Sequence, residues 1–263
     1  MIMVIKMFLN RKMNNRILSF SSVMIGSGSA ANLGLAVALY RLFRSSSYAK
    51  YKYRIRFCWW GAEEIGLLGS DFYVRQERNS STIGERLSDQ LVNLNFDMLG
   101  SPNYVFGIYD GQTIGESIPS SAIPGSNKIT GLFREWFNHE NLPWSNSTLG
   151  TGSDYAPFLA AGIAAGGLLS GASRIKTKEE CDYYASKLGS SDPYCIPTLP
   201  YDPCYHKSCD TIWNINVFAY EKMIKAAAYV IETLARIDNL TEWLYPNGQT
   251  ESSNFYFKKY NII

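Results

Sequence analysis

The spacing of hydrophobic residues changes along the chain and separates predicted strands from predicted helices. In residues 53–60, aromatic and aliphatic side chains alternate with Arg54 and Arg56, which is the period of a β-strand. Shorter apolar runs predict further strands at residues 91–97, 104–109 and 163–169.

Helical spacing of apolar residues marks the segments between the predicted strands. Leu33, Val37, Tyr40 and Phe43 recur every three or four residues, as on the buried face of a helix. The same period predicts helices at residues 29–44, 63–76, 127–141 and 217–237, with a shorter helix after Tyr155. Strands that alternate with helices are typical of an α/β fold in which helices cover a layered sheet.

The chain is expected to form one domain, because no repeat, low-complexity tract or clear linker divides it. We expect this domain at residues 26–238. Residues 1–25 are expected to be a divergent amino-terminal segment, and residues 239–263 a carboxy-terminal tail. Residues 171–211 predict an irregular segment that is longer than an ordinary connection.

The composition narrows the class of protein. The chain has 263 residues, of which 46% are hydrophobic and 18% charged, as is typical of a folded globular domain. Its formal net charge of +2 gives no electrostatic reason to expect nucleic-acid binding. Apolar runs stay shorter than the ~18 residues of a bilayer-crossing helix, so no membrane span is predicted.

The cysteines indicate an oxidising compartment. Four of the five lie close together within the irregular segment: Cys181, Cys195, Cys204 and Cys209. They predict two disulfides, whereas Cys58, in a predicted strand, is expected to be a buried thiol. A zinc finger is the weaker alternative, because the spacings are not those of paired Cys-x-x-Cys motifs.

Three glycosylation sequons are consistent with secretion. They begin at Asn79, Asn146 and Asn239. Residues 1–20, by contrast, make a poor signal peptide, because Lys6 interrupts the apolar stretch and no small-residue cleavage site follows.

Carboxylates follow two of the predicted strands, and an imidazole lies in the cysteine-rich segment. Glu63 and Glu64 come after the strand at 53–60, Asp97 ends the strand at 91–97, and His206 lies far downstream. Ligands and catalytic groups collect at the carboxyl ends of strands in open α/β sheets. Carboxylate and imidazole ligands suit zinc, and a carboxylate that does not bind the metal can serve as general base.

Each of these residues also has a simpler interpretation. The two glutamates could form a solvated helix start with favourable charge placement. Asp97 could cap a turn or helix, His206 could be merely exposed, and Tyr205 could be an ordinary packed aromatic. The combination of all these features in one chain favours the metal site over coincidence.

Several short sequence blocks stand out: Gly-Ser-Gly-Ser-Ala-Ala-Asn-Leu at 26–33, Trp-Gly-Ala-Glu-Glu at 60–64, Leu-Asn-Phe-Asp-Met at 94–98, Ser-Asp-Tyr-Ala-Pro-Phe at 153–158, and Cys-Tyr-His at 204–206. These blocks resemble the M28 family of zinc aminopeptidases, above all the secreted fungal aminopeptidase Y type and its bacterial relatives. They occur in the order of the family and cover the chain from about Gly26 to Ala235.

The resemblance implies a fold and a set of roles. The fold is an α/β zinc-exopeptidase type, with a mixed, mostly parallel sheet between helices. Glu63 would be the general base toward the attacking water, and the hydroxyl of Tyr205 would stabilise the oxyanion. Glu64 would bind one zinc, Asp97 the other, and His206 would complete the ligands of the second.

The resemblance further implies how the cysteines pair and where the protein acts. Cys204–Cys209 would close the loop that carries Tyr205 and His206, and Cys181–Cys195 would be the remaining bridge. The substrates would be the amino termini of peptides or proteins. The location would be secreted, vacuolar or extracellular.

The chain departs from the family pattern before Gly26. Met24 stands where the family has an aspartate that bridges two metals, and no histidine precedes His139, so the family's His-x-Asp motif is missing. Methionine is a poor zinc ligand among oxygen and nitrogen donors. The upstream strands of the family are expected to be missing as well, through a truncated or wrongly joined gene model or a degenerate paralogue. At most one weakly bound zinc ion, and little or no peptidase activity, are therefore expected.

Two main functions remain in competition. The first is a zinc-dependent aminopeptidase, supported by Glu63, Glu64, Asp97, Tyr205 and His206. The second is a non-catalytic protein that uses the M28 fold for binding, supported by the missing histidine and aspartate. The presence of both Glu63 and Tyr205 favours the enzyme. A cytosolic amidohydrolase-like protein with free cysteines fits the cysteine-rich segment less well.

Overall fold

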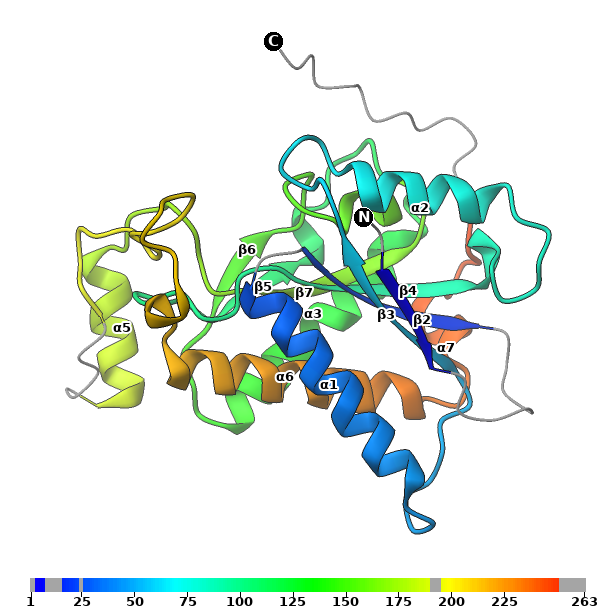
Figure 1. The fold of residues 1–263 in the computed structure, drawn as a ribbon, viewed down its shortest axis with the longest axis horizontal. Coiled ribbons are helices and arrows are strands. Elements are labelled where there is room, and N and C mark those ends of the chain that lie inside the picture. The colour runs from blue at the N-terminus through cyan, green and yellow to red at the C-terminus, as the bar shows by residue number, and fades with distance from the viewer. Residues whose placement is uncertain (1–2, 8–15, 24–25, 190–194, 251–263) are drawn as a thin grey trace.

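A seven-stranded mixed sheet runs through the centre of the computed structural model, which describes residues 3–7, 16–23, 26–189 and 195–250 (Figure 1). The strands are β1 (Met3–Met7), β2 (Ile17–Val23), β3 (Arg54–Trp60), β4 (Gln90–Phe96), β5 (Gly107–Asp110), β6 (Ser145–Thr148) and β7 (Ala164–Leu169). Their order in the sheet is β1-β3-β2-β4-β7-β5-β6. The pairs from β3 through β2 and β4 to β7 are parallel, whereas β1 and β5 join their neighbours β3 and β7 antiparallel. The predicted α/β class with a mixed, mostly parallel sheet is confirmed.

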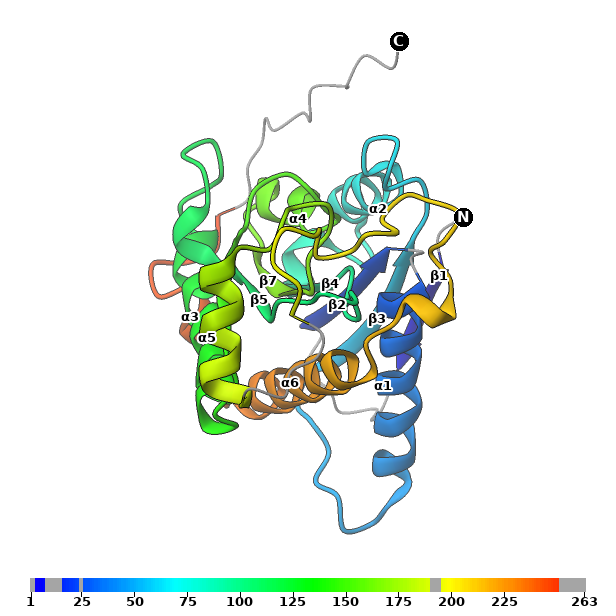
Figure 2. The same cartoon turned by 90° about the vertical axis from the view of Figure 1, so that its left-hand side faces the viewer.

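Helices cover both faces of this sheet. The helices are α1 (Gly26–Arg44), α2 (Leu68–Arg78), α3 (Ala122–His139), α4 (Ala156–Ala160), α5 (Lys178–Leu188), α6 (Val217–Arg236) and α7 (Leu240–Leu244). Figure 2 shows α1 and α6 on one side of the sheet and α2 with α4 on the other. Among the described helices, none combines the length and the hydrophobicity that a bilayer crossing needs.

The inner strand β2 comes from a segment for which the hydrophobic pattern predicts no strand. It pairs in parallel with both β3 and β4, and Ile17, Leu18 and Phe20 are fully buried. Ser19 lies among them and donates a hydrogen bond to Gln90 Oε1 at 2.6 Å. A strand that is buried on both faces carries no alternation of polar and apolar residues, so periodicity does not reveal it. The chain before α1 thus supplies two strands of the sheet, β1 and β2.

Two expectations about the middle of the chain are wrong. The apolar pattern predicts a helix from residue 63, but α2 begins at Leu68, because residues 63–67 form a tight turn. The segment 171–211 is not irregular throughout, since it contains α5. This helix begins with a capping box, in which Thr177 Oγ1 accepts from the backbone N–H of Glu180 at 3.1 Å and the Glu180 carboxylate accepts from that of Thr177.

Two short elements were not predicted. Strand β6 lies in a polar segment and forms the last strand of the sheet beside β5. Helix α7 begins directly after residue 239, in the expected tail, and buries Leu240 and Leu244 completely in the main hydrophobic core. Both elements are too short for a periodic pattern to stand out.

Candidate active site

The candidate site forms at the carboxyl ends of β3 and β4. These strands are parallel and are separated in the sheet only by β2, so the residues that follow them meet at one edge. Glu63 and Glu64 lie in the turn between β3 and α2. Backbone hydrogen bonds close this turn, from Leu67 N to Glu63 O at 2.9 Å and from Leu68 N to Ala62 O at 3.1 Å.

One predicted ligand pair is in direct contact. His206 Nε2 lies 2.8 Å from Glu64 Oε1, and both side chains are about half exposed. His206 has a left-handed backbone with φ of 56°, a conformation that histidine adopts uncommonly. The Cys204–Cys209 disulfide closes the short loop around it, and its ring stacks on Tyr205 with the ring centroids 3.9 Å apart. The structure thus places His206 against Glu64, whereas the resemblance assigned it to the other zinc.

Only one of the two carboxylate oxygens of Asp97 has a hydrogen-bond partner among the described residues. The residue is 9% exposed, and its Oδ2 accepts a hydrogen bond from Ser153 Oγ at 2.9 Å. Asn95 Nδ2 in turn donates to Ser153 Oγ at 2.9 Å. Oδ1 of Asp97 is buried without a hydrogen-bond partner among the described residues. A buried, unpartnered carboxylate oxygen is costly unless a cation or donor joins it.

Burial and mutual repulsion raise the pKa values of three neighbouring carboxyl groups. Burial, followed by the negative charges of Asp97, Asp154 and Glu64, raises the pKa of Glu63 to about 8. Burial raises the pKa of Asp97 to about 6, against the hydrogen bond from Ser153. Burial likewise raises the pKa of Asp154 to about 7. An accumulation of carboxylates of this kind favours a cation at the site.

Asp154 is a site residue to which the sequence assigned no role. It is completely buried, and its Oδ1 accepts a hydrogen bond from Ser70 Oγ at 2.5 Å. Its Oδ2 has no partner in the part of the chain that the structure describes. The Ser-Asp-Tyr block at 153–155 was the available signal, but the block alone does not show that Asp154 faces Glu63 and Asp97.

The described oxygen and nitrogen donors are of the types that bind zinc, but they are fewer than a zinc site usually has. Glu64 and His206 offer an oxygen and a nitrogen 2.8 Å apart, and Asp97 offers an unpartnered oxygen nearby. Zinc in proteins usually has three or four protein ligands. Within the described ranges, no three His, Cys, Asp or Glu side chains are close enough together to hold one metal ion. Met24, at the position of the expected bridging aspartate, lies outside the described residues.

Tyr205 lies beside these groups with its hydroxyl protonated at neutral pH. Burial, followed by the negative charges of Glu64, Asp97 and Glu63, raises the pKa of Tyr205. The side chain is only partly buried, so a substrate can reach it. A neutral hydroxyl in this position is a hydrogen-bond donor.

Replacing Asp154 by asparagine is expected to flatten the pH dependence of stability. The pKa of Asp154 is about 7 in the folded chain, against an ordinary value of 3.8, so the folded protein retains this proton longer than the unfolded chain does. The contribution of Asp154 to wild-type stability therefore decreases as the pH rises from about 4 to about 7, and the variant lacks this contribution. Asparagine keeps the acceptor for Ser70. Urea unfolding at pH 4.5 and pH 8 measures the effect.

The variant is expected to gain about 2–4 kcal/mol over wild type at pH 8 and little at pH 4.5. Asp182→Asn, at an exposed carboxylate of α5 that pairs with Lys178, is the control and should keep the wild-type slope. Equal pH slopes in wild type and Asp154→Asn would show that Asp154 is ionised in the folded protein.

The remaining predicted residues lie outside the site. Cys181 and Cys195 form the second disulfide, and Cys58 is buried and belongs to neither bridge. The three sequon asparagines are exposed, at the end of α2, on β6 and at the start of α7: Asn79, Asn146 and Asn239. His139 is the last residue of α3 and is exposed, with its Nδ1 3.3 Å from Glu140 Oε1. It is therefore not among the candidate ligands.

Comparison with known proteins reveals one family. The sequence profile of peptidase family M28 matches residues 25–231. An aminopeptidase from Pseudomonas aeruginosa is 39% identical over 210 residues, which are 80% of this chain and 35% of the relative. Leucine aminopeptidase 2 from Trichophyton rubrum is 34% identical over 215 residues, 82% of this chain and 40% of the relative. The chain thus spans well under half the length of these relatives.

Solved structures share the fold at low sequence identity. A zinc aminopeptidase from Bacillus subtilis has a TM-score of 0.59 at 19% identity, covering 88% of this chain and 49% of its own. Nicastrin, a component of gamma-secretase, has a TM-score of 0.56 at 9% identity, covering 89% of this chain and 42% of its own. These similarities show a common fold. The chemistry of this chain has to be argued from its own site residues.

Proposed function

The chain belongs to peptidase family M28, and from this premise we propose that it is a zinc-dependent aminopeptidase that releases amino-terminal residues from peptides and proteins. The observation that carries the proposal is the convergence of Glu63, the Glu64–His206 pair, Asp97 and Tyr205 at one edge of the sheet. Relatives of this chain are named aminopeptidase and leucine aminopeptidase, which supports the same reaction.

Glu64 and His206 are the proposed protein ligands of one zinc ion. When bound, the ion supplies a Lewis acid that polarises the scissile carbonyl group and lowers the pKa of water. The unpartnered oxygen of Asp97 and the raised pKa values of the surrounding carboxyl groups support a cation here. The family's second zinc is not part of the proposal.

Glu63 is the proposed general base. It lies next to Glu64 and is partly buried, and its raised pKa lies near neutrality, where a carboxylate both accepts and returns a proton effectively. It would take a proton from the attacking water and pass it to the leaving amine. Glu63 would be protonated after the first transfer and ionised again after the second. One residue would thus serve as base toward the water and as acid toward the leaving amine.

Tyr205 is the proposed donor to the oxyanion. Its hydroxyl is protonated at neutral pH, and the disulfide-closed loop holds it beside His206. A hydrogen bond to the oxygen that becomes negative in the transition state strengthens as the charge develops, and such a donor is worth about 10²–10³-fold in rate.

A second candidate is a non-catalytic protein that uses the M28 fold for binding. The observation that favours it is the incomplete donor set, since the described residues hold no group of three metal-ligating side chains. The similar fold of nicastrin, a component of a larger assembly, shows that this fold also serves as an assembly subunit.

The zinc content and the hydrolysis of leucine amides by the purified chain distinguish the two candidates. The aminopeptidase predicts bound zinc, turnover that a chelator abolishes, and restoration by added zinc, whereas the binding protein predicts no turnover. Glu64→Ala and His206→Ala are expected to lose both zinc and turnover. A folded wild-type chain that neither binds zinc nor turns over substrate would favour the binding protein.

We also propose that the protein works in an oxidising, extracytoplasmic compartment. The disulfides Cys181–Cys195 and Cys204–Cys209 support this location, because such bridges persist under oxidising conditions. The exposure of the three sequon asparagines is compatible with glycosylation at Asn79, Asn146 and Asn239.

A further inference from the structure

The loop at residues 204–210 carries Tyr205 and His206 and has little packing of its own. His206 and the four residues after it are exposed, and Cys204 and Tyr205 are only partly buried. None of these residues belongs to a described hydrophobic cluster. Catalytic groups have to be held within about 0.5 Å of their productive geometry. Because apolar burial does not fix this loop, other contacts must position it.

The chain is fixed on both sides of this loop, at two different places. Before the loop, the backbone N–H of Asp202 donates to the backbone oxygen of Ala172 at 2.9 Å, in the segment after β7. After the loop, the backbone N–H of Asn216 donates to the backbone oxygen of Gly100 at 2.8 Å, in the segment after β4. The side chain of Asn216 also caps α6. The loop thus spans two fixed points, and the way it is closed decides where its side chains lie.

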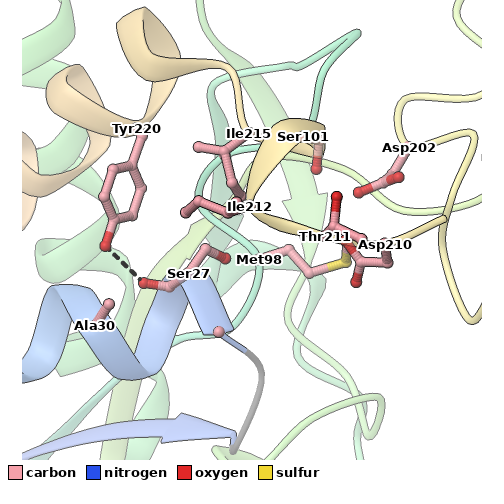
Figure 3. A pocket seen from close by; sticks show the side chains of 12 residues that line it. Ser27, Ala30, Met98, Ser101, Asp202, Asp210, Thr211, Ile212, Ile215 and Tyr220 are labelled. Atoms are coloured by element: carbon pink, nitrogen blue, oxygen red, sulfur yellow. Dashed lines mark hydrogen bonds between the residues drawn. The ribbon is translucent and has the colours of Figure 1, made fainter. Parts of the chain in front are cut away.

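Two kinds of contact close the loop. The Cys204–Cys209 disulfide joins its ends covalently. Outside the disulfide, the side-chain amide of Asn214 donates to Asp202 Oδ1 at 2.9 Å and to Asp210 Oδ1 at 3.2 Å. A primary amide nitrogen carries two hydrogens, so Asn214 can give one to each carboxylate. Figure 3 shows the side chains of Asp202 and Asp210 on the same side of a cavity that adjoins the site.

Asp202 connects the Asn214 amide to the backbone of the loop. Its Oδ1 also accepts from the backbone N–H of Cys204 at 2.9 Å, and its backbone oxygen accepts from the N–H of Tyr205 at 3.3 Å. The residue is 4% exposed, so water competes little for these bonds, and hydrogen bonds to a carboxylate are stronger than neutral ones. On the other side, the backbone N–H of Asp210 closes a turn within the loop. Asn214 therefore reaches the loop from both ends.

The loop holds His206 in an uncommon backbone conformation. Its φ of 56° is left-handed, and its Nε2 lies 2.8 Å from Glu64 Oε1. Such a backbone is strained for residues other than glycine and persists only where the surrounding structure imposes it. A disulfide sets the distance between its two cysteines but not the backbone of the residues between them. The contacts of Asn214 supply a further restraint on the same loop.

We propose that Asn214, with Asp202 and Asp210, forms a clamp that positions Tyr205 and His206, an inference that rests on the proposed aminopeptidase function. Asn214 is a positioning residue, because it acts through the two carboxylates that flank the loop. Loss of the clamp would let the loop move while both proposed reacting groups remain present. Zinc affinity would decrease through His206, and stabilisation of the transition state would decrease through Tyr205.

Asn214→Asp tests the clamp, because aspartate has the shape of asparagine but no amide hydrogens to donate. The substitution also places a third carboxylate beside the two that flank the loop. We expect the backbone amides of residues 204–210 to exchange hydrogen about 10-fold faster than in wild type. Zinc is expected to bind about 10-fold more weakly, and kcat for leucine amides to fall about 10-fold with KM nearly unchanged, because Tyr205 acts in the transition state.

Exchanging the two groups tests whether the hydrogen bond itself matters. In the double variant Asp210→Asn/Asn214→Asp the amide and the carboxylate change places, and the net charge is that of wild type. This variant is expected to regain about 3-fold of the lost zinc affinity and exchange protection, since the contact to Asp202 stays broken. Asn138→Asp, on the exposed side of α3, adds the same charge as Asn214→Asp and keeps the acceptor for Trp144 Nε1. As the matched control, it should behave like wild type.

Hydrogen exchange is measured on the metal-free chain and needs no turnover, so it separates the clamp from the proposed activity. Unchanged exchange of the loop in Asn214→Asp would overturn the clamp, even if leucine amides are hydrolysed. Faster exchange throughout the chain, including β4 and α6, would also overturn it, since Asn214 would then support the whole fold. A wild-type chain without zinc or turnover, whose loop alone exchanges faster in Asn214→Asp, would keep the clamp and exclude the aminopeptidase.

Discussion

Replacing Glu63 by glutamine is expected to lower kcat for peptide hydrolysis by about 10²–10⁴-fold while zinc content stays at the wild-type level. Glutamine has the shape of glutamate but cannot accept the proton of the attacking water. The proposed ligands Glu64 and His206 are left intact, so the metal site should be unaffected. Steady-state kinetics and zinc analysis on the same preparations measure the two outcomes.

The same substitution has an effect on stability that distinguishes lost chemistry from lost structure. The raised pKa of Glu63 shows that its ionised form is disfavoured in the folded chain. Removing this charge from the vicinity of Asp97 and Asp154 should therefore leave the free energy of unfolding unchanged or increased above pH 5. Glu116→Gln, at an exposed position, is the control and should keep full turnover. A Glu63→Gln chain with wild-type kcat would remove Glu63 from the mechanism.

Replacing Glu77 by leucine is expected to lower the free energy of unfolding by about 3–5 kcal/mol. Arg56 of β3 and Glu77 of α2 form a buried ion pair, with side chains that are each 4% exposed. Arg56 also donates to the backbone oxygen of Gly84 at 2.9 Å, and Tyr73 donates to the Glu77 carboxylate at 2.7 Å. Without Glu77, the guanidinium of Arg56 would remain buried with no opposing charge. Chemical denaturation of the variant measures the loss.

The double variant Arg56→Met/Glu77→Leu shows whether the unpaired charge causes the loss. It is expected to regain most of the stability, because two apolar side chains of similar size replace the pair. Glu221→Leu breaks an exposed pair with Lys225 on α6 and is expected to change stability little. If the double variant loses as much free energy of unfolding as Glu77→Leu does, the loss comes from altered packing and not from the unpaired charge. Because α2 follows directly after the turn that holds Glu63 and Glu64, this pair also anchors the site to the sheet.

Periodicity predicts most of the long elements of this fold. Helices α1, α3 and α6 and strands β3, β4 and β7 lie within a few residues of their predicted positions, because each has one covered face or a long apolar run. The strands β1 and β2, the helix α5 and the short elements β6 and α7 were missed. Burial on both faces hides the pattern of β2, and short length hides that of β6 and α7.

The site was predicted by residue type and order, and its contacts were not. The sequence indicates Glu63, Glu64, Asp97, Tyr205 and His206 as a group. It does not show that His206 contacts Glu64, which lies 142 positions away. Such a contact depends on how a loop returns to the sheet edge, and local spacing does not encode that path.

The sequence by itself determined the α/β class, the family and the candidate chemistry, because hydrophobic period and short motifs are local properties of the chain. The tertiary structure alone decided which groups share one environment. Asp154 is remote from Glu63 in sequence, yet its negative charge helps to raise the Glu63 pKa. The Asn214 amide likewise contacts Asp202 only because the loop between them returns to its start. Electrostatics and such contacts depend on distances in space, and folding sets those distances.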